Sequence, residues 1–235
     1  MKKGSINQIE TLGLVDGPGI RTIVFLNGCN LRCKYCHNPE MWKKREKNYT
    51  SDELFKKIIR NKPYFARNNG GVTFSGGEPL LQIEFLIETI KKLKKENIHV
   101  ALDTSGHGNG NYKKLLNLID LVILDIKHVD KEEYKLLTGQ DIDESENFIK
   151  ALNKSNKPVW RRQVIIPGIN DNEEYLKKLK IYLNKIKNIK KIEFLPFHHL
   201  GFKKYEKLGL PNPLEKTKEM DVEKCDKLYE TFNNL

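Results

Sequence analysis

The sequence contains the stretch Asn27-Gly28-Cys29-Asn30-Leu31-Arg32-Cys33-Lys34-Tyr35-Cys36-His37-Asn38, in which three of the chain's four cysteines follow a C-x3-C-x2-C spacing. Three thiolates this close together can hold a metal centre and leave one coordination position without a protein ligand. Structural metal sites normally have a fourth protein ligand, whereas an open position is typical of a site that binds something reactive. We therefore expect the rest of the chain to form a scaffold around that open position.

Other interpretations of this loop need to be weighed. Cys33 to His37 matches the C-x-x-C-H haem-attachment pattern, and the pair Cys33 and Cys36 matches a thiol redox pattern. Haem of that kind is attached after export, yet Met1 to Ser5 leads into no apolar signal core. The redox pattern leaves Cys29 unexplained. A zinc knuckle with His37 as the fourth ligand stays open, but an iron–sulfur cluster with one open iron is favoured.

Length and composition limit the class of protein. The chain has 235 residues, enough for a substantial core. The clustering of its cysteines argues against a disulfide framework and for a reducing compartment, so we expect a cytoplasmic protein. No apolar run approaches the roughly 20 residues that a membrane span needs, and no membrane partner is expected.

The charge of the chain raises the question of nucleic acid as a partner. The formal net charge is +11. However, the lysines are scattered over amphipathic segments such as residues 90–95, where a solvated helix face is the simpler interpretation. Aromatic residues do not alternate with the basic ones in a stacking pattern. We therefore expect no nucleic-acid partner and a basic surface that suits an acidic protein.

Six segments are expected to be strands because each is a short apolar run that ends at a turn. They are residues 22–26, 71–74, 100–102, 121–124, 158–166 and 192–195. A short alternating segment at residues 6–10 and the rigid turn Asp16-Gly17-Pro18-Gly19-Ile20-Arg21 precede them. Amphipathic helices are expected over residues 51–61, 80–96 and 215–232.

The order of these elements predicts the fold. Strands that alternate with helices form a parallel sheet with right-handed crossovers. Six such units are two short of the eight in a full TIM barrel. We therefore predict an α/β fold, an open partial TIM-type (β/α)6 barrel. No linker or shift in composition divides the chain, so residues 1–235 are expected to be a single domain.

Polar groups follow or lie within the predicted strands. They are the cysteine loop, Gly76-Gly77-Glu78, Asp103-Thr104, Asp125 with Lys127, Arg161 with Arg162, and His198. Each taken alone has a structural explanation, such as a surface ion pair, a helix cap or a hydrogen-bonded core histidine. Their shared position changes this, because the carboxyl ends of barrel strands meet at the mouth where such folds place their active sites.

The residue types at this mouth suit one kind of ligand. An open iron favours a ligand with amine and carboxylate donors. The glycines of Gly76-Gly77-Glu78 allow close backbone approach, and the Glu78 carboxylate can accept from an ammonium group. Lys127, Arg162 and His198 could neutralise a carboxylate or contact a ribose. Asp103-Thr104 offers oxygens to a hard cation or a hydroxyl. The sequence thus predicts a pocket for an amino-acid nucleoside beside a redox cluster.

These motifs resemble those of radical S-adenosylmethionine (SAM) enzymes, which combine the C-x3-C-x2-C loop, Gly-Gly-Glu and an open (β/α)6 barrel. The Asp16-Gly17-Pro18-Gly19 turn and Tyr35-Cys36-His37-Asn38 are typical of the activases of glycyl-radical enzymes. Residues 41–70 contain no cysteine, whereas many such activases carry an inserted cysteine-rich domain there. The resemblance is therefore to the compact, pyruvate formate-lyase type of activase and covers essentially the whole chain. One departure is Glu78-Pro79-Leu80, a common variant in the superfamily.

The resemblance implies a chemistry. Cys29, Cys33 and Cys36 would hold a [4Fe-4S] cluster, and SAM would chelate the fourth iron. An electron from flavodoxin or ferredoxin would lead to reductive cleavage of SAM, and the 5′-deoxyadenosyl radical would take a hydrogen atom from a glycine Cα of the partner, pyruvate formate-lyase. Cys225, far from the motif, is expected to be an unliganded thiol.

The resemblance also implies roles for individual residues. The three cluster cysteines and Lys127 are the catalytic candidates. Asp103 and Thr104 would also hold a monovalent cation, Na⁺ or K⁺, beside the SAM carboxylate. Asp16, Arg21 and His37 would meet the glycine loop of the partner. The candidates for cofactor binding are Tyr35, His37, Gly76, Gly77, Glu78, Asp103, Thr104, Asp125, Lys127, Arg162 and His198.

Three alternatives stay open at this point. One is an activase of another glycyl-radical enzyme, and a second is a radical SAM enzyme with a small-molecule substrate. The third is a basic metal-binding module for nucleic acid, which would bind zinc and lose affinity steeply with salt. That module gives no role to Gly76-Gly77-Glu78 or to the other strand-end residues.

Overall fold

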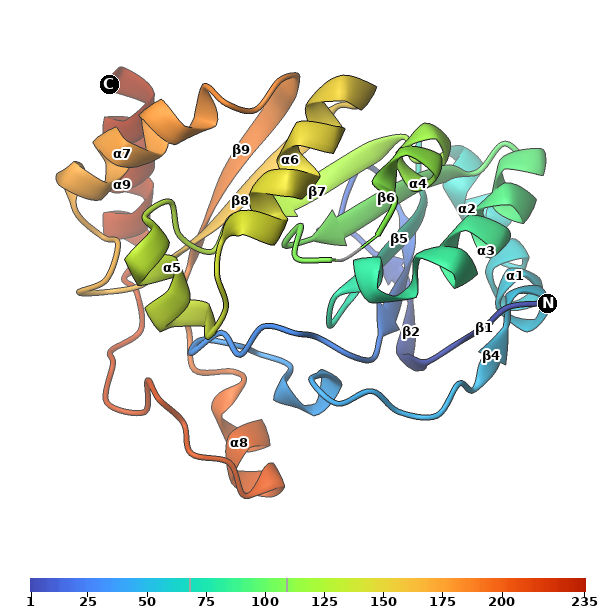
Figure 1. The fold of residues 1–235 in the computed structure, drawn as a ribbon, viewed down its shortest axis with the longest axis horizontal. Helices are drawn as coiled ribbons and strands as arrows, with labels where there is room; N and C mark the ends of the chain where they lie inside the picture. The colour runs from blue at the N-terminus through green and yellow to red at the C-terminus, as the bar shows by residue number, and fades with distance from the viewer. Residues whose placement is uncertain (68, 109) are drawn as a thin grey trace.

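The computed structural model describes residues 1–67, 69–108 and 110–235, and its central element is a twisted sheet of mostly parallel strands (Figure 1). Within the described residues this sheet has seven strands in the order β2-β3-β5-β6-β7-β8-β9, of which only β2 is antiparallel to its neighbour. The strands are β2 (Ile6–Gly13), β3 (Arg21–Leu26), β5 (Gly71–Gly76), β6 (His99–Thr104), β7 (Leu121–Asp125), β8 (Val159–Ile165) and β9 (Ile189–Pro196). The six predicted strands are confirmed, with small shifts at their ends.

Helices follow the parallel strands along the chain, which confirms the repeating strand–helix pattern. They are α1 (Ser51–Ile59), α2 (Lys62–Arg67), α3 (Ile83–Lys95), α4 (Tyr112–Leu118), α5 (Lys131–Thr138), α6 (Asp143–Ser155), α7 (Glu173–Leu183), α8 (Phe202–Leu208) and α9 (Val222–Asn234), with short 3-10 turns at η1 (Pro39–Met41) and η2 (Pro79–Gln82). A small separate sheet pairs β1 (Lys3–Gly4) with β4 (Tyr49–Thr50). The arrangement is the open, partial (β/α)6 barrel that the sequence predicts.

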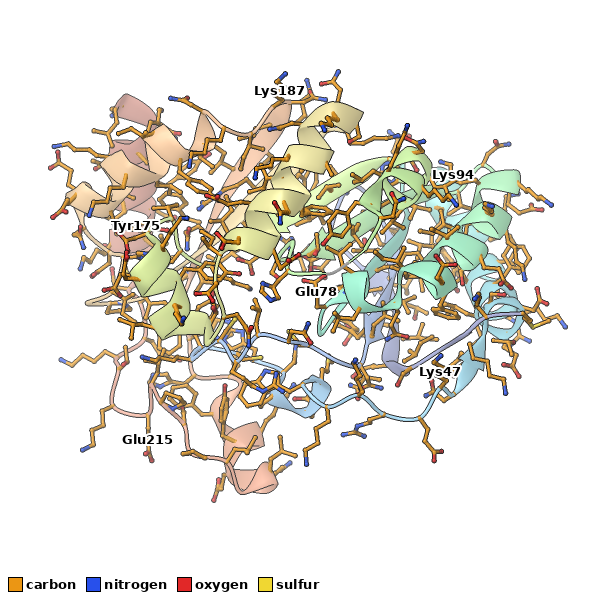
Figure 2. The ribbon with its side chains drawn as sticks, in the orientation of Figure 1. Lys47, Glu78, Lys94, Tyr175, Lys187 and Glu215 are labelled. Carbon is orange, nitrogen blue, oxygen red and sulfur yellow. The ribbon has the colours of Figure 1, made fainter. Side chains whose placement is uncertain are left out.

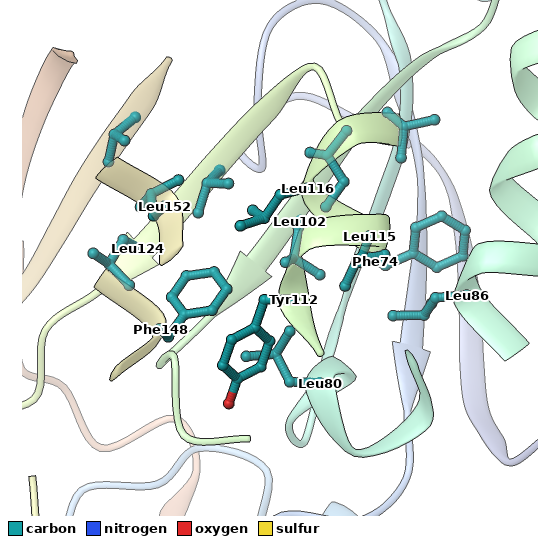
Figure 3. Close-up of a cluster of buried hydrophobic side chains, with 14 of the residues drawn as sticks. Phe74, Leu80, Leu86, Leu102, Tyr112, Leu115, Leu116, Leu124, Phe148 and Leu152 are labelled. Atoms are coloured by element: carbon teal, nitrogen blue, oxygen red, sulfur yellow. The ribbon is translucent and has the colours of Figure 1, made fainter. Parts of the chain in front are cut away.

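The main core lies between the sheet and the row formed by α3, α4 and α6 (Figure 3). Phe74, Leu102 and Leu124 project from successive strands toward this row, and each is almost completely buried. Leu86 on α3 and Phe148 on α6 pack against them from the helix side. Burial of one such side chain contributes about 1.5–3 kcal/mol. This packing fixes the strands relative to one another. It thereby also fixes the positions at which the loops leave the strand ends.

The barrel is open because β2 and β9 are the two edge strands of the sheet in the part of the chain that the structure describes. One arginine bridges the gap between them. Arg162 on β8 donates to Asp16 Oδ1 at 2.9 Å, in the loop after β2, and to Glu193 Oε2 at 3.0 Å, on β9. It also donates to the Val15 carbonyl. The loop after β2 is thereby tied to the far side of the barrel.

Lysine side chains extend from several elements. Figure 2 shows Lys47, Lys94 and Lys187 projecting at separate places on the periphery, whereas Glu78 lies in the interior. These three lysines come from the segment before β4, from α3 and from the segment before β9. The same part of the chain, residues 1–67, 69–108 and 110–235, includes no helix that is both long and apolar enough to cross a bilayer.

The predicted start of the last helix is wrong. We expected it near residue 215, but α9 begins at Val222, with the Asp221 side chain accepting from Lys224 N at 2.8 Å as its cap. The preceding residues instead return to the sheet, where Met220 N donates to the Phe197 carbonyl at 2.8 Å. Leu214 and Met220 are buried there in a second hydrophobic cluster. Packing of these two residues beside β9 outweighs the local preference for helix.

The expectation that Arg21 meets a partner protein is also wrong. Arg21 stands at the first position of β3, opposite the end that carries the cysteine loop, and its side chain is completely buried. Its guanidinium donates to Thr73 Oγ1 at 2.6 Å and to the carbonyls of Val72 at 2.6 Å and Pro18 at 2.8 Å. Arg21 therefore joins the Asp16–Arg21 turn to β5 and has a structural role.

Arg21→Met should lower the free energy of unfolding by about 2–3 kcal/mol, because hydrogen bonds to a charged donor are lost and buried acceptors stay unpaired. Urea unfolding followed by circular dichroism measures this change. Arg60→Met is the matched control, since Arg60 is exposed at the end of α1. Equal midpoints for the two variants would contradict the structural role.

Candidate functional site

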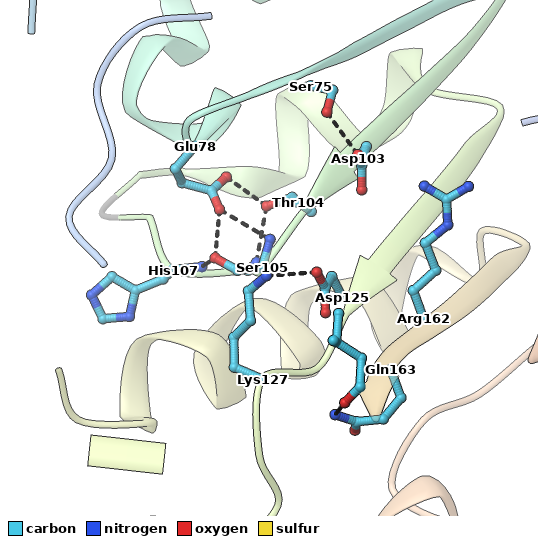
Figure 4. A network of polar contacts seen from close by, with 12 residues as sticks. Ser75, Glu78, Asp103, Thr104, Ser105, His107, Asp125, Lys127, Arg162 and Gln163 are labelled. Atoms are coloured by element: carbon cyan, nitrogen blue, oxygen red, sulfur yellow. Dashed lines mark hydrogen bonds and ion pairs between the residues drawn. The ribbon is translucent and has the colours of Figure 1, made fainter. Parts of the chain in front are cut away.

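A cavity of about 420 Å³ opens at the carboxyl ends of the parallel strands. This volume lies within the range of small-molecule sites. From the cysteine loop, it is lined by Cys29, Cys33, Tyr35, Cys36 and His37. From the strand ends and the segments beyond them, it is lined by Gly76, Gly77, Asp103, Thr104, Asp125, Lys127, Arg162 and His198. Every candidate for cofactor binding lines this cavity except Glu78, whose carboxylate lies against Thr104 and Ser105 (Figure 4). Arg161, expected at the same mouth, is completely buried and is not among the lining residues.

Backbone hydrogen bonds fix the cysteine loop at its start and in its middle. Gly28 N donates to the Met41 carbonyl at 2.7 Å, and Arg32 N and Lys34 N donate to the carbonyls of Thr138 at 2.7 Å and Leu137 at 2.9 Å. The loop therefore spans from η1 to the end of α5. Since it makes these bonds without regular secondary structure, its three thiols are presented to the cavity by a fixed backbone.

Burial raises the pKa of all three thiols. The pKa of Cys29 is raised to about 12, with the Glu78 carboxylate adding to the effect of burial. The pKa values of Cys33 and Cys36 are raised by burial as well. Thiolates are the form that binds metals, so the loop needs the positive charge of a metal centre to hold its cysteines deprotonated.

The loop does not fit a zinc knuckle. Within residues 1–67, 69–108 and 110–235, no three His, Cys, Asp or Glu side chains converge closely enough to hold a single metal ion. His37, the fourth ligand of that alternative, instead stacks on His198 with ring centroids 4.1 Å apart, and its Nε2 lies 3.2 Å from the His198 carbonyl. A cluster of several irons binds each thiolate at a different iron, so its ligands need not converge on one point.

Two glycines allow β5 to end against the start of the cysteine loop. Gly76 has φ +111°, and a Cβ there would lie 2.2 Å from Leu26 N. A Cβ on Gly77 would lie 2.3 Å from the Gly28 carbonyl oxygen. Both distances exclude any larger residue. The Gly-Gly pair therefore joins the ends of β3 and β5 and leaves its own backbone facing the cavity.

The Glu78 carboxylate is bound within the protein, not directed at a ligand (Figure 4). Glu78 is 1% exposed. One oxygen accepts from Leu80 N at 3.0 Å and Thr104 Oγ1 at 2.5 Å. The other accepts from Ser105 N at 3.0 Å and Ser105 Oγ at 2.6 Å. The expectation that this carboxylate accepts from a ligand ammonium is therefore corrected: with four internal donors, Glu78 holds the turn after β6 in place.

Asp103 and Arg162 form the polar floor of the cavity. Burial raises the pKa of Asp103 to about 6, although Arg162 and the Ser75 hydroxyl, which donates to Asp103 Oδ2 at 2.7 Å, oppose that rise. Burial alone would lower the pKa of Arg162, but Asp103, Asp16 and Glu193 raise it overall. Ser75 and Ser105 were not predicted from the sequence to be site residues, although each adjoins one of the strand-end motifs.

Lys127 places a positive charge beside the cysteine loop. Its Nζ lies 2.5 Å from Asp125 Oδ2 and 5.5 Å from the centroid of the Tyr35 ring. Burial alone would lower the pKa of Lys127, but Asp125, Tyr35 and Cys33 hold it well above its usual value. Lys127 is therefore a permanent cation in the cavity wall.

The side chains around this cavity fit the iron–sulfur cluster and SAM that the sequence motifs imply. Among the described side chains, Tyr35 OH and Asp125 Oδ1 are buried at this cavity without a hydrogen-bond partner. Unpaired buried polar atoms call for a bound ligand or ion. Together with three thiols, exposed glycine backbone and a fixed cation, they suit a metal cluster with a polar, charged ligand.

Comparison with known proteins identifies the class of this fold and site. The family model described as the radical SAM superfamily matches residues 23–179. The chain therefore belongs to the radical SAM superfamily, whose members use a [4Fe-4S] cluster and SAM. A radical SAM methyltransferase from Sphaerobacter thermophilus has the same fold, with a TM-score of 0.65 over 98% of this chain and 75% of that one, at 16% sequence identity.

Curated relatives define the family more narrowly. The chain is 50% identical to the pyruvate formate-lyase-activating enzyme of Clostridium pasteurianum, over 100% of this chain and 99% of that protein. It is 42% identical to the enzyme of the same name from Staphylococcus epidermidis, over 99% and 96%. Within the superfamily, the chain thus belongs to the family of pyruvate formate-lyase-activating enzymes.

Glu78→Gln should lower the free energy of unfolding by about 1–3 kcal/mol, because the amide nitrogen of glutamine would face donors that now pair with a carboxylate oxygen. Thermal unfolding by circular dichroism measures the loss. The matched control is Glu84→Gln, at an exposed position of α3. A stability for Glu78→Gln equal to that of the control would show that the carboxylate does not hold the turn.

Proposed function

We propose that this protein activates pyruvate formate-lyase by generating a radical on a glycine of that partner. The observation that carries the proposal is the placement of three loop thiols, the Gly-Gly backbone and a fixed lysine around one cavity. Identity of 50% along the whole length of a relative named for this activity supports the choice of partner. When bound, the cluster and SAM supply the reductive cleavage that generates a radical able to take a hydrogen atom from a glycine Cα.

Different residues of the chain would bind the cluster and the different parts of SAM. Cys29, Cys33 and Cys36 would hold the cluster on three irons. The backbone of Gly76 and Gly77 would meet the amino-acid part of SAM, since that backbone lines the cavity. The rigid loop and the short strand ends would fix the orientation of the reacting groups.

The charged residues of the cavity would position the same ligand. Lys127 stays protonated beside Asp125 and would pair with the SAM carboxylate. Asp125 has one oxygen free for a ribose hydroxyl or for a monovalent cation held by Asp103 and Thr104. His198, which faces the cavity stacked on His37, would contact the nucleoside.

Access for a protein loop is provided by the open barrel. In the described part of the chain the sheet ends at β2 and β9 without closing, and Asp16 lines the cavity from the β2 side. Asp16 is tied to Arg162, so the two residues would shape this side of the cavity for the glycine loop. Water and oxygen must be excluded during the reaction, and an incoming loop that fills the opening would do so.

Three further expectations belong to this proposal. The chain would work as one domain, because the residues of the cavity come from segments between Asp16 and His198. Flavodoxin or ferredoxin would supply the electron. The protein would act in the cytoplasm, where its thiols stay reduced and the partner resides.

The cysteines allow a matched test. Cys33→Ala should lose bound iron and the ability to activate pyruvate formate-lyase, because one ligand of the cluster is removed. Cys225→Ala should keep both, since Cys225 is buried in α9 within the second hydrophobic cluster and does not line the cavity. Iron content and formate-lyase activity after anaerobic incubation with SAM and dithionite measure the difference. A fully active Cys33→Ala protein would overturn the assignment.

A further inference from the structure

A second hollow, of about 460 Å³, lies beside the start of the cysteine loop. Among the described residues it shares no lining residue with the cavity of the candidate site. Its floor is apolar and partly exposed, and consists of Leu81 in η2 with Ile83 and Ile87 in α3. The lysines that line it are all exposed and are Lys2, Lys3, Lys47 and Lys114. We call these seven residues the basic hollow.

The basic hollow lies next to the first cluster cysteine. A Cβ on Gly28, the residue before Cys29, would lie 3.9 Å from Leu81 Cδ1 and 3.2 Å from Lys44 Cγ. The exposed Lys44 therefore stands at the edge of the hollow, close to its floor. Cys29, the next residue of the loop, lines the cavity. A residue without a side chain thus separates the floor of the hollow from a cluster ligand.

Hydrogen bonds fix the walls of the hollow. Gln82, between Leu81 and Ile83 in the chain, accepts from Ser5 N at 2.8 Å through its Oε1. Its Nε2 donates to the carbonyls of Ser5 at 3.0 Å and Asn27 at 2.9 Å. The N-terminal segment, η2 and the residue before Gly28 are therefore held together. A surface that is already ordered loses little conformational freedom when a partner binds.

The positive charge around the hollow is not neutralised within the protein. In residues 1–67, 69–108 and 110–235, neither Lys44 nor any lysine of the hollow forms an ion pair, whereas Lys177 and Lys178 on α7 each pair with a glutamate one turn away. The segment of residues 43–47 has four basic side chains and one acidic side chain. Glu84 is the one carboxylate among the described lining residues. Such a field attracts an acidic surface.

The position of the hollow indicates what kind of partner fits it. The proposed reaction needs one electron from outside the protein. SAM and the glycine loop would occupy the cavity, so the electron donor must approach the cluster from another side. The hollow gives that access next to Cys29, and an apolar floor with a charged rim has the composition of a protein–protein interface.

We propose that the basic hollow is the docking site of an acidic one-electron carrier protein, which delivers its electron at the Gly28–Cys29 end of the cysteine loop. This inference rests on the proposed function, because it needs a cluster on the three cysteines. One electron leaves the reduced carrier and enters the cluster, so the carrier is oxidised and the cluster is reduced. The lysines of the hollow and Lys44 attract and orient the carrier, and the apolar floor brings it close to the loop.

The test measures binding and electron transfer separately, on the full chain with its cluster reconstituted. The double variant Lys44→Glu with Lys47→Glu reverses two charges at the hollow. Its affinity for oxidised flavodoxin or ferredoxin, two acidic carriers, should fall about tenfold at low ionic strength in titration calorimetry. The second-order rate of cluster reduction by the reduced carrier, followed by stopped flow, should also fall about tenfold. Both losses should shrink as salt is added, because salt screens exposed charges.

A matched control changes the same amount of charge elsewhere. Lys187 and Lys190 are exposed and form no ion pair in the part of the chain that the structure describes. They lie just before and at the start of β9, whereas the cavity is at the carboxyl end of that strand. Figure 2 shows Lys187 and Lys47 at separate places on the periphery. Lys187→Glu with Lys190→Glu should bind the carriers and be reduced by them as the wild type is.

A small uncharged donor separates docking from the later steps. Photoreduced 5-deazariboflavin should reduce the clusters of the wild type and of Lys44→Glu with Lys47→Glu equally fast. The glycyl radical that then forms on pyruvate formate-lyase should reach the same level with both proteins. A lower level with the variant would show that the hollow binds the formate-lyase, and would overturn the inference.

Unchanged affinity and unchanged reduction rate of the double variant with the carriers would also overturn the inference and leave the proposed function intact. Failure of both carriers to reduce a wild-type cluster that deazariboflavin does reduce would have the same meaning. A wild-type protein that forms no reducible cluster at all would overturn the proposed function together with this inference.

Discussion

The site depends on one backbone contact, between the end of β5 and the start of the cysteine loop. Gly77 N donates to the Leu26 carbonyl at 2.8 Å, and Glu78 N donates to the Gly28 carbonyl at 2.8 Å. This approach is possible only because Gly76 and Gly77 have no Cβ, since one would lie 2.2–2.3 Å from backbone atoms of the neighbouring strand end. The contact fixes the loop that presents the thiols relative to the backbone that faces their ligand.

Buried ion pairs fix the other polar side chains of the cavity. Arg162 connects Asp16 and Glu193 across the open side of the barrel, and Lys127 pairs with Asp125 next to the thiols. Side chains in these pairs are 10–20% exposed, so solvent screens them less than surface pairs. They hold the polar cavity together beside the opening between β2 and β9, the edge strands in the described residues, and a protein loop would enter from this side.

Much of this arrangement could be predicted from the sequence. The six parallel strands follow from short apolar runs, and the convergence of Asp103, Lys127 and His198 follows from their places at strand ends. What sequence pattern does not give is the direction of a side chain within a known element. Arg21 and Glu78 both lie in recognisable motifs, yet the first points into the base of the barrel and the second into the wall.

Long-range packing accounts for the other differences. The start of α9 depends on Leu214 and Met220 returning to the sheet, and nothing in residues 215–221 indicates this locally. Trp42, which has Arg32 over its ring, packs edge-on against Tyr205, a residue more than 160 positions further along the chain. Such contacts become visible only when the tertiary structure brings the segments together.

The central claim is that the cavity serves hydrogen abstraction from a glycine of a protein partner. The most direct measurement is an anaerobic EPR spectrum of pyruvate formate-lyase after incubation with the reconstituted protein, SAM and a reductant. The account predicts a doublet from a glycyl radical on the partner, which collapses to a singlet when the glycine Cα carries deuterium. Formation of 5′-deoxyadenosine without any radical on the partner would contradict it and would direct attention to another substrate.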